Sequence, residues 1–249
     1  GIVLRTTDAG ITWKTITLRQ EVRSVSAIGK NALIGLPVKY LSQSGDFFTS
    51  NDFGKNWEIT QVDLHGSQYR FVSSIQFIND NEGYFSADSL LYYTNDAGES
   101  WTNSEIPAYR GIINDFMFFN HKNACVSIES FPEITHFDST NVRQVYLSTN
   151  GGNEWQLVKS LYDSSYRRFN SLFMSDEKTI WLGYGHEIIH RKSGMIYHTT
   201  DSGNSWDSSE VDGAVTDIRF FSDSLGYAVG SNALIMKTTD GGHSWQREY

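Results

Sequence analysis

The chain is poor in the residues that mark disulfide-bonded, metal-binding or disordered proteins. It has 1 cysteine, Cys125, which excludes an internal disulfide framework and a zinc site built on cysteines. It has 3 prolines, and 39% of its 249 residues are hydrophobic, which is typical of a chain that folds around a core. No run approaches the roughly 20 apolar residues of a membrane-spanning helix, so we expect no membrane insertion.

Positive charge is also scarce. The chain has 20 Lys and Arg residues against 29 Asp and Glu residues, which gives a net charge of −9. An acidic surface repels phosphate backbones, so the composition argues against nucleic-acid binding. Residues 1–5 do not resemble a signal peptide, so we expect any targeting segment to be absent or removed.

What the chain does have is a repeated pattern: Ser or Thr, then Asp or Asn, Gly and Trp at fixed offsets. The copies are Thr6, Asp8, Gly10 and Trp13; Ser50, Asp52, Gly54 and Trp57; Thr94, Asp96, Gly98 and Trp101; Ser148, Asn150, Gly152 and Trp155; Thr199, Asp201, Gly203 and Trp206; and Thr238, Asp240, Gly242 and Trp245. We call each copy a box turn. Their number identifies the chain as a repeat protein.

The residue types of the box turn predict a self-contained turn between two strands. Gly supplies a positive φ, the Asp accepts hydrogen bonds from backbone N–H groups of its own turn, and the Trp buries its ring against the neighbouring sheet. Asn150 keeps the acceptor without the charge. Each copy offers one carboxylate at most, whereas a calcium site needs several, so we expect no metal here.

Short runs with a period of two surround the box turns. In the last copy they predict strands at 215–221, 226–230, 234–239 and from 244; in the third copy they predict strands at 72–78, 83–86, 90–94 and from 101. Consecutive box tryptophans lie 44, 44, 54, 51 and 39 residues apart. Four short strands at this spacing predict an all-β fold, a β-propeller of four-stranded antiparallel blades.

The first box turn follows only one strand, at residues 2–6, so we expect the N-terminal blade to be incomplete in this chain and residues upstream of it to be missing. The best count is six blades, and seven if more sequence lies upstream. We predict a single propeller domain over 1–249, with repeat units at approximately 1–20, 21–64, 65–107, 108–162, 163–211 and 212–249.

The box turn resembles the Asp-box, or bacterial neuraminidase repeat, of sialidases, xyloglucanases and sortilin-type propellers. The segments 226–230 and 235–242 are similar to the repeat unit of the photosystem II assembly/stability factor family and its bacterial relatives. The resemblance implies a propeller that is often extracytoplasmic and often a binding or assembly module. It therefore implies a secreted or periplasmic location, but a repeat of this kind says little about the site that the scaffold carries.

Strand direction alternates within a blade, so the turn between the second and third strands lies on the face opposite the box turns. Three units have insertions there, at 37–45, 128–142 and 185–194. Variable loops on a rigid scaffold are where function usually lies. We therefore expect the face opposite the box turns to carry the binding site.

An arginine recurs where the first strand of a unit begins, and a tyrosine precedes it in three copies. The residues are Arg23, Tyr69, Arg70, Tyr109, Arg110, Tyr166, Arg167 and Arg168. The first strand is the innermost of a blade, so these side chains should gather at the mouth of the channel. Clustered guanidinium groups favour a carboxylate, a phosphate or an acidic peptide. The alternative is that the arginines are repeat consensus and bond to local carbonyl or acidic groups.

Catalytic chemistry has weaker support. The string at 186–190 matches a zinc-protease motif, but in an extended strand its histidines are about 13 Å apart, too far to share one metal. Glu133, Asp138 and Glu187 in the inserted loops leave a glycoside hydrolase or sialidase-like enzyme as the alternative function. The Arg-Ile-Pro segment of sialidases is absent near the start.

No haem-attachment string and no phosphate-binding glycine loop occurs, so we expect no cofactor. Cys125 and Trp181 lie in predicted second strands and are expected in the core. The sequence thus favours a non-catalytic propeller that binds a protein, a peptide or an anionic group. Carbohydrate is the alternative partner.

Overall fold

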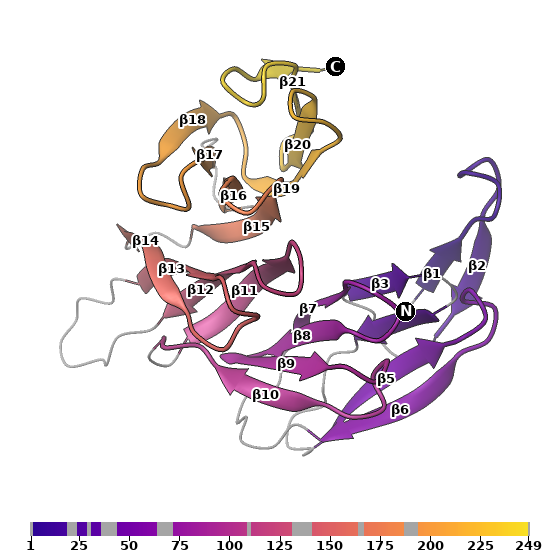
Figure 1. Cartoon of the computed structure of the whole chain (residues 1–249). Helices are drawn as coiled ribbons and strands as arrows, with labels where there is room; N and C mark the ends of the chain where they lie inside the picture. The colour runs from indigo at the N-terminus through magenta and orange to yellow at the C-terminus, as the bar shows by residue number, and fades with distance from the viewer. Residues whose placement is uncertain are drawn as a thin grey trace. The chain divides into compact units, whose positions relative to one another are not determined.

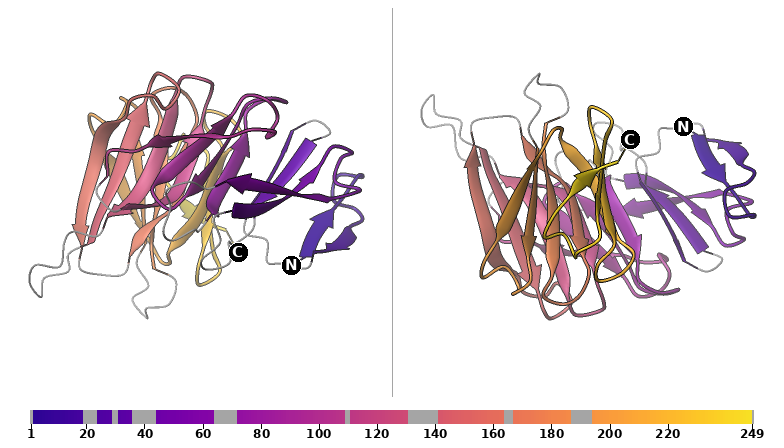
Figure 2. Two further views of the ribbon diagram at one scale, coloured as in Figure 1. Left: turned by 90° about the horizontal axis from the view of Figure 1, so that it is seen from below. Right: turned by 90° about the horizontal axis from the view of Figure 1, so that it is seen from above.

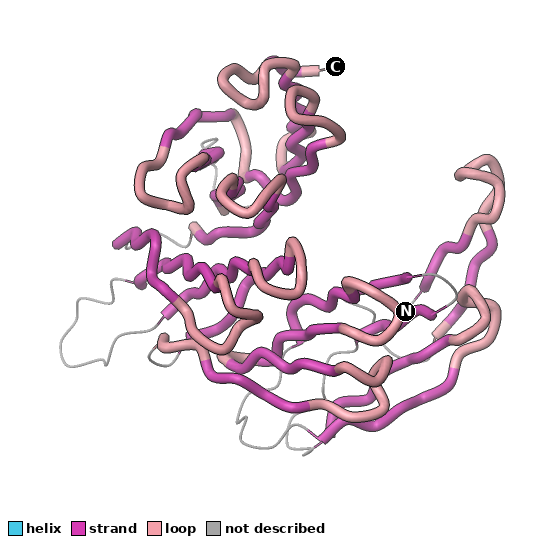
Figure 3. The backbone as a smooth tube through the Cα atoms, in the orientation of Figure 1, coloured by secondary structure: helices cyan, strands magenta, loops and turns pink. Residues whose placement is uncertain are grey.

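The computed structural model describes residues 2–18, 24–28, 31–35, 44–63, 72–108, 111–130, 141–163, 167–186 and 194–248. Every regular element in these ranges is a β-strand, as Figure 3 shows. The same ranges contain no helix that is long and apolar enough to cross a membrane. The predicted all-β class is therefore confirmed.

The described strands form one two-stranded and five four-stranded antiparallel sheets (Figure 1). The two-stranded sheet pairs β1 (Ile2–Arg5) with β2 (Lys14–Thr17). The four-stranded sheets are β3 (Ser24–Ile28), β4 (Asn31–Gly35), β5 (Ser44–Ser50) and β6 (Glu58–Asp63); β7 (Val72–Phe77), β8 (Gly83–Ala87), β9 (Leu90–Thr94) and β10 (Thr102–Glu105); β11 (Gly111–Phe118), β12 (Ala124–Ser130), β13 (Asn141–Ser148) and β14 (Gln156–Asp163); β15 (Arg168–Met174), β16 (Ile180–Gly185), β17 (Gly194–Thr199) and β18 (Asp207–Val211); and β19 (Val215–Phe220), β20 (Gly226–Gly230), β21 (Leu234–Thr238) and β22 (Gln246–Arg247). In each sheet, strands that are neighbours in sequence are neighbours in space.

The predicted strands agree closely with the observed ones, and the incomplete first sheet is confirmed. The last strand begins at Gln246 rather than at Ser244, because the N–H of Ser244 donates to Asp240 Oδ1 at 3.0 Å inside the box turn. The chain groups into two compact units, 1–105 and 106–249, which we call unit one and unit two. The single domain over residues 1–249 and the boundaries of the six sequence repeats stay predictions.

The third box turn shows how this sequence closes on itself. The Thr94 hydroxyl donates to Asp96 Oδ1 at 2.7 Å and accepts from the Gly98 N–H at 2.9 Å. Asp96 Oδ1 also accepts from the Ser100 N–H at 2.9 Å, and the Trp101 indole N–H donates to the Gly98 carbonyl at 3.2 Å. Gly98 has a φ of +91°, in the region that favours glycine.

The same acceptor geometry recurs in the other five box turns. The Asp or Asn oxygen accepts an N–H from the residue four places later, at 2.9–3.0 Å, in Asp8, Asp52, Asn150, Asp201 and Asp240. The predicted packing of the tryptophans is confirmed in part, because Trp206 donates to the Val158 carbonyl of the preceding sheet at 3.2 Å. Trp13 departs from it and is 57% exposed.

Consecutive sheets of a unit pack through their innermost strands. In unit two the Leu172 N–H of β15 donates to Asp115 Oδ2 of β11 at 3.0 Å, and the Asn170 amide of β15 donates to the Val215 carbonyl of β19 at 3.1 Å. Figure 2 shows the strands of these sheets running alongside one another. Apolar side chains fill the space between the sheets, and among them Cys125 is fully buried and Trp181 is 2% exposed, as predicted.

The box carboxylates predict a stability that is lost in acid. Hydrogen bonds from the residue four places later lower the pKa of Asp96 from 3.8 to about 2, and the pKa of Asp201 falls likewise. A carboxyl group with a lowered pKa in the folded state stabilises the fold above its unfolded pKa and ceases to do so as the pH falls through the folded value. We therefore expect the melting temperature to drop between about pH 4 and pH 2.

Amide substitution tests this origin of the acid sensitivity. The double variant Asp96→Asn and Asp201→Asn should show a smaller drop in melting temperature over that range, because an amide at Asn150 already holds the same turn. The reverse variant, Asn150→Asp, should show a larger drop. Identical slopes in all three proteins, followed by circular dichroism, would contradict the assignment.

Candidate functional site

The structure places two of the predicted site residues at the start of an innermost strand. Arg168 is the first residue of β15, pairs with Gly185 and is exposed, while Arg167 directly precedes it and is half-buried. The other end of the same sheet carries the box turn, since Met174 pairs with Ile180 there. Both arginines therefore lie at the end opposite the box turn. Six predicted residues, Arg23, Tyr69, Arg70, Tyr109, Arg110 and Tyr166, lie outside the described residues.

The predicted insertions are bounded by strands that end at this same end of their sheets. The insertion predicted at 128–142 is shorter than expected, because β12 continues to Ser130 and β13 begins at Asn141. The described ranges exclude 36–43, 131–140 and 187–193, and with them Glu133, Asp138, Glu187 and most of the motif at 186–190. Among the described residues no group of His, Cys, Asp or Glu could hold a metal ion.

A buried ionic cluster, which the sequence did not predict, lies at the end of the fourth sheet (β11–β14) opposite the box turn. Arg143 on β13 is fully buried, and its Nη2 lies 3.4 Å from Glu129 Oε1 on β12. Arg143 Nη1 donates to the Asn141 carbonyl at 2.9 Å, and the Asn141 amide donates to Glu129 Oε1 at 3.2 Å. The cluster ties together the strand ends that flank 131–140. Its signal in the sequence is an arginine at a position where the strand pattern calls for an apolar residue.

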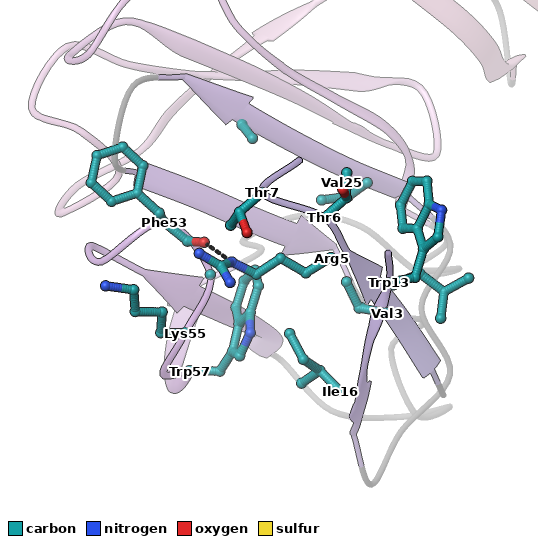
Figure 4. A pocket seen from close by; sticks show the side chains of 13 residues that line it. Val3, Arg5, Thr6, Thr7, Trp13, Ile16, Val25, Phe53, Lys55 and Trp57 are labelled. Carbon is teal, nitrogen blue, oxygen red and sulfur yellow. Dashed lines mark hydrogen bonds between the residues drawn. The ribbon is translucent and has the colours of Figure 1, made fainter. Parts of the chain in front are cut away.

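Unit one contains an open groove of about 690 Å³, shown in Figure 4. It is lined by Val3, Leu4, Arg5, Thr6, Thr7, Trp13, Ile16, Val25, Ala27, Phe53, Gly54, Lys55 and Trp57. Four of its apolar side chains are largely exposed: Leu4 at 57%, Trp13 at 57%, Val25 at 56% and Phe53 at 60%. The Arg5 Nε–H donates to the Phe53 carbonyl at 2.6 Å. The groove lies between β1 and β2 on one side and β3 and the second box turn on the other. Because it is formed by two different sheets, sequence alone did not predict it.

Unit two contains a smaller, polar pocket of about 260 Å³ between β17, β18 and the last box turn. Its lining includes Trp181, His198, Asp207 and His243. The His198 ring stacks on Trp181 with a centroid distance of 4.0 Å, and the His198 and His243 centroids are 6.3 Å apart. Burial lowers the pKa of His198, with a smaller opposing effect from Asp207, so His198 favours its neutral form.

Known proteins share this architecture. A family model described as "Sortilin, neurotensin receptor 3" matches residues 45–188. The photosystem II stability/assembly factor HCF136 of Guillardia theta, a chloroplast protein, is 22% identical over 78% of this chain. The alignment covers 51% of that protein, so the chain spans about half the length of its curated relative.

Two solved structures have the same fold. YCF48 from Cyanidioschyzon merolae has a TM-score of 0.66 at 18% identity, covering 100% of this chain and 78% of its own. The GH74 xyloglucanase from Xanthomonas campestris has a TM-score of 0.65 at 12% identity, covering 97% of this chain and 41% of its own. At such low identity the likeness shows the fold alone, and it confirms the predicted β-propeller. The number of blades stays a prediction.

The resemblance to photosystem II assembly factors, inferred from the repeat unit, agrees with both the chloroplast relative and YCF48. The resemblance to sortilin-type propellers agrees with the family model, which covers more than half of the sequence. The chain therefore belongs to the sortilin (Vps10) family.

Proposed function

We propose that this chain is a non-catalytic binding and assembly module that recognises a protein or peptide at the end of its sheets opposite the box turns. The observation that carries the proposal is the similarity to a photosystem II stability/assembly factor over 78% of the chain. That relative is described as a stability and assembly factor, which favours a binding role, whereas the likeness to a xyloglucanase is one of fold alone.

The chemistry of the two sheet ends supports this choice of surface. In the box turns the hydroxyl and carboxylate oxygens already accept hydrogen bonds from their own turn, as the bonds of Thr94 and Asp96 illustrate. Groups that are satisfied locally gain little by binding a ligand. The opposite end carries the strand ends that flank the long connections and the exposed Arg168.

The recurring arginines give the proposed partner its chemistry. A guanidinium group binds a carboxylate through two parallel hydrogen bonds, which suits it to an anionic ligand. We therefore propose that each of the recurring arginines, Arg23, Arg70, Arg110, Arg167 and Arg168, can engage an anionic group, such as an acidic side chain or the carboxyl terminus of a bound peptide.

Removing two of these charges provides the test. We expect the variant Arg70→Gln and Arg110→Gln to bind a fluorescent octapeptide of alternating glutamate and alanine at least about tenfold more weakly than the wild type, by anisotropy. The control is Arg219→Gln, because Arg219 lies on an innermost strand toward the box-turn end and pairs with Asp217 at 3.4 Å. Equal affinity in all three proteins would contradict the proposal.

Enzymatic activity would also contradict the proposed binding function. We expect no release of aglycone from aryl sialosides and no cleavage of xyloglucan. Turnover that disappears on Glu133→Gln or Asp138→Asn would instead assign the same end of the molecule to a glycoside hydrolase.

A further inference from the structure

The polar pocket of unit two lies between the last two sheets of the chain. It is enclosed by β17, β18 and the last box turn, and Trp181 of β16 lines it as well. Its volume of about 260 Å³ is close to the lower end of the range for small-molecule sites, which begins at roughly 300 Å³. The pocket therefore has room for one small molecule.

The preceding sheet interface is filled at the corresponding place by Val158. A Cβ on Gly203 in the fifth box turn would clash with the Val158 side chain, and the Trp206 indole N–H donates to the Val158 carbonyl at 3.2 Å. Ser209 has the corresponding position in the next interface, since both residues are the third after a box tryptophan. Serine is smaller than valine and polar, and Ser209 lines the pocket.

Two indole N–H groups in the pocket lining are buried and have no hydrogen-bond partner among the described residues. They belong to Trp181, which is 2% exposed, and to Trp245. Trp206 in the preceding box turn donates to a glycine carbonyl of its own turn at 3.1 Å, a bond that Trp245 lacks. Trp57 and Trp155 lack it too, but neither lines this pocket. A buried donor without an acceptor is unfavourable, so these two N–H groups favour a ligand that carries acceptor oxygens.

The other polar groups of the pocket offer both donors and acceptors. They are the imidazoles of His198 and His243, the carboxylate of Asp207 and the hydroxyls of Ser208 and Ser209. His198 is 7% exposed, and because burial lowers its pKa the ring favours the neutral form, with one donor and one acceptor nitrogen. The lining contains no Lys or Arg.

This set of groups favours a neutral ligand over an ion. An anion would meet the Asp207 carboxylate without a lysine or arginine to offset it. A cation would meet indole N–H groups, which only donate. No group of His, Cys, Asp or Glu in the described ranges is placed to hold a metal ion. A hydroxyl group both accepts and donates, so a hydroxylated ligand matches the indole N–H groups and the carboxylate together.

We propose that this pocket binds one small neutral polyol, such as a single sugar ring. Its hydroxyl oxygens accept from the indole N–H groups of Trp181 and Trp245, and one of its hydroxyls donates to the carboxylate of Asp207. His198 and Asp207 are paired at the box-turn end of β17 and β18, so the site lies at the end of the sheets opposite the recurring arginines. The box-turn oxygens, which are satisfied within their own turns, take no part.

Methyl glycosides of glucose, galactose and mannose are the probes, titrated into the full chain and followed by NMR of the ¹⁵N-labelled indole groups. We expect at least one to bind saturably with millimolar affinity and to shift the signals of Trp181 and Trp245, assigned from phenylalanine variants. The Trp206 signal is the internal control. It should stay in place, because its N–H already donates to two carbonyl groups.

Three variants separate the pocket from the rest of the surface. Asp207→Ala should weaken glycoside binding at least about tenfold, because the ligand loses a charged acceptor. Glu210→Ala is the matched control on the same strand, since Glu210 is exposed and does not line the pocket, and it should leave the affinity unchanged. Ser209→Val should fill the pocket and abolish binding, while circular dichroism shows that the variant remains folded.

Failure of all three glycosides to shift either indole signal, or equal affinity of Asp207→Ala and the wild type, would overturn the proposal. So would binding of inorganic phosphate that strengthens as the pH falls through the range in which histidine gains a proton, because the pocket would then belong to an anion. These outcomes are independent of the acidic peptide, which should bind equally well to Asp207→Ala and to the wild type.

Discussion

Replacing Trp181 by alanine is expected to lower the free energy of unfolding by about 3–5 kcal/mol, as is usual for a large aromatic side chain in a core. Trp181 is 2% exposed and stacks on His198 and on Phe220, at centroid distances of 4.0 and 4.5 Å. A Cβ on Gly242 would clash with the Trp181 ring, so the ring packs directly against the last box turn. Alanine would leave a cavity between two sheets of unit two.

Urea unfolding followed by circular dichroism measures this loss. The matched control is Trp13→Ala, because Trp13 belongs to a box turn and yet is 57% exposed. We expect the control to lose far less stability than Trp181→Ala, because little of the apolar surface of Trp13 is buried in the folded protein. Similar losses in the two variants would contradict the packing role assigned to Trp181.

Replacing Arg143 by alanine should be comparably damaging, at about 3–5 kcal/mol, because removing one partner of a buried ion pair leaves the other uncompensated. Arg143 is fully buried beside Glu129, whose side chain is 11% exposed. The double variant Arg143→Met and Glu129→Gln should recover much of the loss, since it removes both charges and keeps most of the volume.

The contrast between single and double variants is the informative result. If Arg143→Ala costs no more than a surface substitution such as Arg219→Ala, the pair has no structural role. If the double variant is as unstable as the single one, the loss comes from packing rather than from unpaired charge. Chemical unfolding of the three proteins and the wild type distinguishes these cases.

Much of the fold could be predicted because its main signal is local. The bonds of a box turn join residues no more than four places apart, as with Thr94, Asp96 and Ser100, so the pattern and the turn are read from one short segment. The strands follow from their spacing around these turns, and the first strand at residues 2–6 already indicated an incomplete first sheet.

The features that could not be predicted depend on neighbouring sheets. Val25 is 56% exposed and lines the groove in unit one, and the sequence of β3 does not reveal this. Arg143 is buried because Glu129 and Asn141 come together across a connection. Of the candidate site, strand direction alone placed Arg168 at the end opposite the box turn. A location outside the cytoplasm and the anionic character of the ligand stay predictions.

The decisive experiment measures peptide binding and thermal melting on the same two variants. We expect Asp96→Ala in a box turn to lower the melting temperature and to leave peptide affinity unchanged. We expect Arg70→Gln with Arg110→Gln to lower affinity for the acidic peptide and to leave the melting temperature unchanged. A loss of affinity in Asp96→Ala, without a loss in the arginine variant, would contradict the claim that the box turns stabilise the fold and the opposite ends of the sheets bind the peptide.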